Sequence, residues 1–106
     1  MNTITYKGTK WSYICLNKKG FLSLDDIHEF MERTIEMHVD GDLRRKVKGE
    51  NFEGVLYTHR EYHMLESFGG QEYIGELETN RGKATISVLL RDPESKDSLL
   101  PAYSRN

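Results

Sequence analysis

Two histidines four residues apart, His59 and His63, are the residues of this chain best spaced for metal or acid/base chemistry. On a helix, side chains at positions i and i+4 share a face, so both imidazoles could ligate one zinc ion. The metalloprotease pattern His-Glu-x-x-His has glutamate directly after the first histidine, where this chain has Arg60, and Glu61 follows one position later. A metal-dependent hydrolase or nuclease using His59 and His63 is therefore retained only as an alternative prediction.

The local structure around these histidines can be read in two ways. Thr58 and Glu61 form a capping-box pattern, and Tyr62 and Leu65 follow at helical spacing, which favours a short helix over residues 59–68. A strand fits the same residues. Because a strand would hold the two histidines about 13 Å apart, only the helix would allow a shared metal ion.

Charge is clustered in the middle of the chain. An acidic row follows the outside of a predicted helix and consists of Asp25, Glu29, Glu32 and Glu36. A basic run, predicted as an exposed loop or a short turn of helix, comes soon afterwards and includes Arg44, Arg45, Lys46 and Lys48. An acidic row can meet a basic groove on a partner and imitate a phosphate track, whereas a basic loop can meet phosphates directly. A solvated helix face followed by a solvated loop fits the same pattern, and the functional prediction is that one of these two clusters is a docking surface.

Aromatic residues on predicted strands suggest a second alternative, a nucleic-acid-binding module. Bases can stack on strand aromatics while nearby lysines and arginines contact phosphates. The candidates for stacking are Trp11, Tyr13, Tyr57 and Tyr73, together with the basic loop 44–48. The net charge of -2 gives no overall attraction to nucleic acid. Nucleic acid is therefore a possible partner, and protein is the expected one.

The clearest structural element is a helix predicted over about residues 24–38. Ser23 followed by Asp26 is an N-cap pattern, and Gly41 marks the far end. The predicted apolar stripe consists of Leu24, Ile27, Met31 and Ile35, with Phe30 at its edge. His38 falls on this stripe in the last turn, which is typical of a core histidine whose ring nitrogens are hydrogen-bonded.

The remaining elements are predicted to be strands. Residues 3–17 indicate a hairpin turning at Gly8 and Thr9, and a strand begins near Phe52. A second hairpin joins residues 72–78 to 83–90, with Gly75 marking a bulge or a close approach of another element. The expected fold is α+β, one domain over residues 1–92 with an antiparallel sheet of about five strands and one main helix. A polar tail follows over 93–106.

Composition narrows the function by exclusion. The chain has 106 residues and a single cysteine, Cys15, which suits a reducing, cytoplasmic setting. No apolar run is long enough to cross a membrane, no glycine loop suits a phosphate, and no cofactor is expected. We predict a small non-catalytic regulatory protein that binds and modulates or inhibits a macromolecular partner. Phage or mobile-element antagonists of host defence, such as anti-CRISPR proteins, are chains of this kind.

Overall fold

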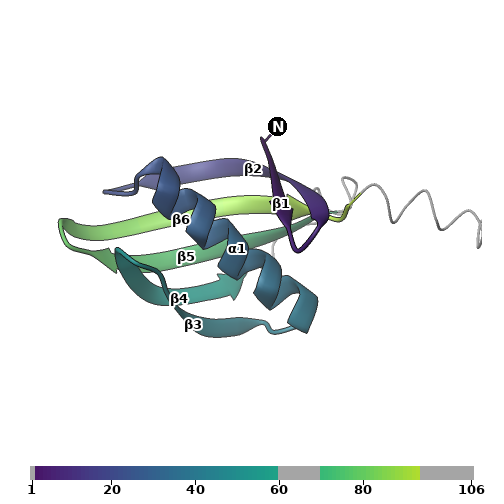
Figure 1. Ribbon diagram of the computed structural model, residues 1–106. Coiled ribbons are helices and arrows are strands. Elements are labelled where there is room, and N and C mark those ends of the chain that lie inside the picture. Colours follow the sequence, from purple (N-terminus) through teal and green to yellow (C-terminus); the bar gives the residue numbers. More distant parts are fainter. Residues whose placement is uncertain (1, 60–69, 94–106) are drawn as a thin grey trace, which may run out of the picture.

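The computed structural model describes residues 2–59 and 70–93, which form one antiparallel sheet and one helix (Figure 1). The elements in chain order are β1 (Asn2–Tyr6), β2 (Thr9–Lys19), α1 (Leu24–Asp40), β3 (Arg44–Lys48), β4 (Phe52–Thr58), β5 (Gly70–Thr79) and β6 (Gly82–Arg91). The predicted α+β class and the single main helix are confirmed. Residues 60–68 of the predicted short helix and the tail beyond residue 93 lie outside the described residues.

The sheet has six strands in the order β1-β2-β6-β5-β4-β3. Strands β3 to β6 form a meander, and its last strand, β6, pairs with β2. Helix α1 therefore connects β2 to β3 at the far edge of the same sheet. The prediction of about five strands missed β3. The basic segment 44–48, expected as a loop, is in fact an edge strand paired with β4. Charged side chains are common on edge strands because they discourage pairing with another chain.

Helix α1 lies across one face of the sheet and encloses the core between the two layers (Figure 1). The helix contributes Phe30, Met31, Ile35 and Met37, none of which is exposed. The sheet contributes buried residues from every strand: Ile4, Trp11, Val47, Phe52, Leu56, Tyr73, Leu77, Ala84, Ile86, Val88 and Leu90. The opposite face of the sheet, which we call the open face, has no helix over it among the described residues.

The core face of α1 is rotated from the predicted stripe. Leu24 is 83% exposed, Ile27 is half-buried, and Phe30 lies at the centre of the contact rather than at its edge. Thr34 is also fully buried, where its hydroxyl donates to the carbonyl of Phe30 at 2.8 Å. A hydroxyl satisfied within its own helix can face an apolar layer, so hydropathy alone misplaced the centre of the stripe.

The predicted cap of α1 is confirmed and is a full capping box. The Ser23 hydroxyl accepts the Asp26 backbone N–H at 3.1 Å, and the Asp26 carboxylate accepts the Ser23 N–H at 3.1 Å. The side chain of Asn51 donates to the other Asp26 oxygen at 3.3 Å. The helix ends two residues later than predicted, at Asp40, where Gly41 has φ 78° and its N–H reaches the last carbonyls.

Replacing Ser23 with alanine is expected to lower the free energy of unfolding by about 1 kcal/mol, because the Asp26 N–H loses its acceptor.

Burial raises the Asp26 pKa, but hydrogen bonds from Ser23 and Asn51 and the charge of Arg81 outweigh it, so the pKa lies below its ordinary value. A lowered pKa in the folded state gives stability above the unfolded pKa that is lost as the pH falls. Urea unfolding from pH 7 to pH 3 should therefore show a smaller loss in Asp26→Asn than in the native chain.

The first hairpin turns one residue earlier than predicted. Tyr6 pairs with Thr9, so Lys7 and Gly8 are the two central residues, with φ of 50° and 83°. Positive φ at both positions is the twist that suits a two-residue hairpin. The second hairpin joins the two predicted strands and turns at Asn80 and Arg81, since Thr79 pairs with Gly82.

Candidate functional site

The acidic row predicted on the helix lies on the outside of α1, but its members differ in their surroundings. Asp25 is exposed, and Glu32 lies 3.6 Å from the imidazole of His28. Glu29 is half-buried, and its two oxygens accept the backbone N–H of Glu50 at 3.0 and 3.1 Å. Glu29 therefore fixes the β3–β4 turn to the helix, whereas Asp25 and Glu32 remain available at the surface.

The fourth member of the row, Glu36, belongs to a charge cluster at the end of the helix. Its carboxylate lies 3.6 Å from the guanidinium of Arg45, which also contacts Asp40 at 2.9 Å and Asp42. The hydrogen bonds to Asp42 and Asp40 raise the pKa of Arg45. Three carboxylates share this one guanidinium, so the cluster is negative even after Arg45 is counted.

The basic run is divided by the alternation of strand β3. Arg45 points to the helix side, while Arg44, Lys46 and Lys48 are exposed on the open face. Arg44 lies over the ring of Tyr57 at 5.7 Å from its centroid. The predicted basic docking loop is therefore an edge strand. Arg45 belongs to the acidic cluster, and only the other three basic residues form an exposed row.

Carboxylates lie among these cations on the open face. Lys48 pairs across the strands with Glu53, and Glu53 with Glu78. Glu76 accepts the Tyr57 hydroxyl at 2.9 Å, and this hydrogen bond raises the pKa of Tyr57. The open face thus has mixed charge, which is unlike the continuous basic track that phosphates favour.

The predicted stacking aromatics do not share a surface. Trp11 and Tyr73 are buried under α1, Tyr13 is half-buried on that same side, and Tyr57 alone among the four lies on the open face. A sheet that stacks several bases needs its aromatics on one exposed face. The four residues therefore do not form a platform.

His59, the described member of the predicted metal pair, contacts a carboxylate. Its Nδ1–H donates to Glu72 at 3.0 Å, and the other Glu72 oxygen accepts the hydroxyl of Ser87 at 2.8 Å. His63 lies outside the described residues. Among residues 2–59 and 70–93, no group of three histidine, cysteine or carboxylate side chains is arranged to hold a metal ion.

A hydrogen-bonded chain of Tyr73, His38 and Asp92 joins β5, α1 and the end of β6. His38 Nε2 lies 3.1 Å from the carboxylate of Asp92, and Nδ1 lies 2.5 Å from the Tyr73 hydroxyl. When Nε2–H donates to Asp92, the neutral ring accepts the tyrosine proton at Nδ1. The rings of His38 and Trp11 also pack in a T-shaped arrangement, with centroids 5.6 Å apart and planes at 87°. Sequence reasoning singled out His38 as a satisfied core histidine but gave no signal for its partners.

Replacing Tyr73 with phenylalanine is expected to change stability most at alkaline pH. Burial, with a contribution from the charge of Asp92, raises the pKa of Tyr73 from 10.0 to about 12. The folded state therefore keeps a proton that the unfolded state releases, and stability falls by up to about 1.4 kcal/mol per pH unit between these values. Chemical unfolding at pH 9, 10 and 11 should show this decline in the native chain and a shallower one in Tyr73→Phe.

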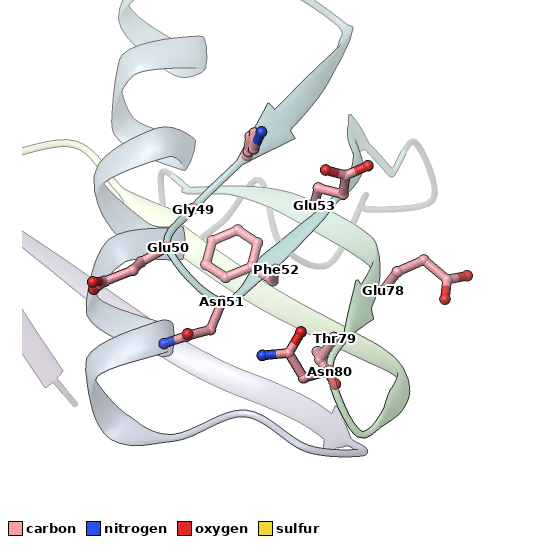
Figure 2. Close-up of a pocket in the computed structure, with 9 residues that line it drawn as sticks. Gly49, Glu50, Asn51, Phe52, Glu53, Glu78, Thr79 and Asn80 are labelled. Atoms are coloured by element: carbon pink, nitrogen blue, oxygen red, sulfur yellow. The ribbon is translucent and has the colours of Figure 1, made fainter.

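A polar hollow lies between the β3–β4 turn and the β5–β6 turn (Figure 2). Figure 2 shows the ring of Phe52 beside the backbone of Gly49 and Glu50, with the carboxylates of Glu53 and Glu78 pointing away from it. A Cβ on Gly49 would run into the Phe52 ring, so glycine is required for this close approach. The hollow has a volume of 270 Å³ and no convergent set of catalytic groups among its described lining residues.

Large apolar side chains are exposed beside the acidic row. Leu24 and Val39, near the two ends of α1, are 83% and 65% exposed, and Leu43 just beyond the helix is 57% exposed. These side chains therefore give the acidic side of the molecule apolar contact area as well as charge.

No helix among the described residues is both long and apolar enough to span a membrane.

Comparisons of the chain with protein-family models, with curated proteins and with solved structures gave no match.

Proposed function

We propose that this protein is a non-catalytic binding protein that docks the outer side of α1 onto a basic surface of a protein partner and inhibits or modulates it. The observation that carries this proposal is the combination of charge and apolar area on one side of the molecule. Asp25, Glu32 and the Arg45 cluster provide negative charge, and Leu24 and Val39 flank them as exposed apolar groups.

Electrostatic complementarity and apolar area have separate roles in such an interface. Opposite charges speed the encounter and exclude wrong partners, whereas buried apolar groups supply most of the affinity. The carboxylates of α1 follow the helix as a row of negative charge, so a groove that normally holds a phosphate backbone is the complementary surface. Competition with nucleic acid for that groove is the form of inhibition that we propose, in a cytoplasmic setting and of the kind used by antagonists of host defence.

The nucleic-acid-binding alternative has one observation in its favour, the row of Arg44, Lys46 and Lys48 on the open face. The carboxylates of Glu53 and Glu76 among them, and the burial of the other aromatics, weigh against it. We therefore treat direct nucleic-acid binding as an outcome of the test.

The test is capture of partners by the tagged full-length protein from a lysate of the source organism, with half of the sample treated with nuclease. We expect to recover a protein partner in stoichiometric amount in both the treated and the untreated half of the sample. The bound partner should no longer carry nucleic acid, and the complex should dissociate at high salt. Recovery of nucleic acid alone, or of proteins lost on nuclease treatment, would overturn the proposal and favour the β3 row.

A further inference from the structure

A hollow of 290 Å³ lies between the β1–β2 hairpin and the C-terminal half of α1. Two aromatic residues of the hairpin, Tyr6 and Trp11, line one part of it, and two carboxylates of the helix, Glu36 and Asp40, line another. Val39 completes the helix side and is 65% exposed. The hollow therefore opens on the same acidic side of the molecule that the proposed function uses.

The aromatic wall is fixed by packing. Trp11 is only 6% exposed, pairs with Ile4 of the neighbouring strand β1, and packs at a right angle against the ring of His38. His38 is in turn held by Tyr73 and Asp92, as described above. A wall whose side chains already have one position loses little conformational entropy when a ligand binds.

Two cations of the chain itself already contact groups of this hollow. The guanidinium of Arg45 lies 2.9 Å from Asp40 and 3.6 Å from Glu36. The ammonium of Lys7, which itself lines the hollow, lies over the ring of Tyr6, 5.4 Å from its centroid, so an arginine entering there would take its place. The carboxylates thus suit a guanidinium, and the tyrosine ring is placed to receive a cation.

We propose that this hollow takes an arginine side chain from the basic surface of the partner. The guanidinium would stack against the aromatic wall and pair with Glu36 and Asp40, whose charges Arg45 alone does not balance. A planar cation with several N–H donors can make both contacts at once, which an ammonium does less well. This proposal rests on the proposed function and names the chemistry of its central contact.

The single tryptophan makes the test specific to the site. The full-length protein, labelled with nitrogen-15, gives one indole N–H resonance, from Trp11. The probe is a capped pentapeptide with arginine at its centre and alanine elsewhere, and its control has neutral citrulline in place of arginine. We expect the indole resonance to shift with the arginine peptide, with a Kd in the millimolar range, and to stay in place with citrulline.

Paired variants separate the hollow from general acidity. Glu36→Gln with Asp40→Asn should raise the Kd of the arginine peptide about tenfold, a loss of about 1.4 kcal/mol. Asp25→Asn with Glu32→Gln removes the same charge from the same helix outside the hollow and should change it less than about twofold, as screened charges do. The amide dispersion of each variant reports whether it folds.

Three results would overturn the proposal: no shift of the Trp11 indole, an equal shift with citrulline, or equal weakening by both variant pairs. These failures are distinct from failure of the proposed function. If the captured partner is retained while the peptide fails, the helix docks without inserting an arginine. If the peptide binds while no partner is captured, the hollow stands and the proposed function falls.

Discussion

Gly75→Ala is expected to lower the free energy of unfolding by about 3 kcal/mol, at the upper end for overpacked cores. Gly75 is buried at the centre of β5, and a Cβ there would run into the ring of Phe30 and lie 3.3 Å from Ile86. Phe30 has no exposed surface and is enclosed by the core, so its ring cannot move aside. Alanine should otherwise favour a strand over glycine, which makes a large loss diagnostic of the clash.

The matched control for this prediction is Phe30→Leu, alone and combined with Gly75→Ala. Leucine shortens the group that meets the new methyl, so the double variant should be more stable than the sum of the two single losses allows. A coupling free energy of about 1 kcal/mol or more in urea unfolding is expected for residues in contact. Strict additivity would show that Phe30 does not set the need for glycine.

The close contact between Gly75 and Phe30 explains which features of α1 could be predicted from the sequence and which could not. The cap at Ser23 and Asp26 is local, so the start of the helix was predicted correctly and its end to within two residues. The choice of core face was not local, because it depends on Gly75 in a distant strand making room for Phe30. Leu24 fits the helical period but lies in the first turn with 83% of its surface exposed.

Strand β3 was missed for a related reason. Lysine has low strand propensity, and a run of lysines and arginines is more typical of a solvated loop. The alternation is visible only when the surroundings are known: Val47 is buried, Arg45 reaches the helix carboxylates, and Lys46 faces outward. Pairing with β4 supplies the backbone hydrogen bonds that the side chains do not encourage.

The candidate site shows the same limit of local reasoning. The acidic row was predicted from helical spacing, and all four members lie on the outer part of α1. Spacing along the chain does not show that Glu29 accepts the Glu50 N–H or that Glu36 contacts Arg45, because these are contacts between residues distant in the sequence. The aromatic and acidic hollow combines β1, β2 and α1, so no spacing in the chain predicts it.

Charge reversal on the outer helix, Asp25→Lys with Glu32→Lys, is expected to raise the Kd for the captured partner at least about 100-fold. Both positions are at the surface, and each new lysine would face the partner's own basic groups, where like charges cost several kcal/mol. Asp25 also favours the positive end of the helix, so the free energy of unfolding should fall by about 1 kcal/mol or less. Biolayer interferometry at two salt concentrations measures the first effect, and urea unfolding measures the second.

The matched control reverses the same number of charges on the other side of the sheet, as Lys46→Glu with Lys48→Glu. The two pairs point in opposite directions from the sheet, so a partner that docks on α1 should bind this control with nearly unchanged affinity. Raising the salt concentration should increase the Kd of the native complex and bring it closer to the Kd of the helix variant. Salt screens the same electrostatic attraction that the helix substitutions remove. If the β3 pair abolishes binding and the helix pair does not, the docking surface is the open face, and the acidic helix is a solvated surface.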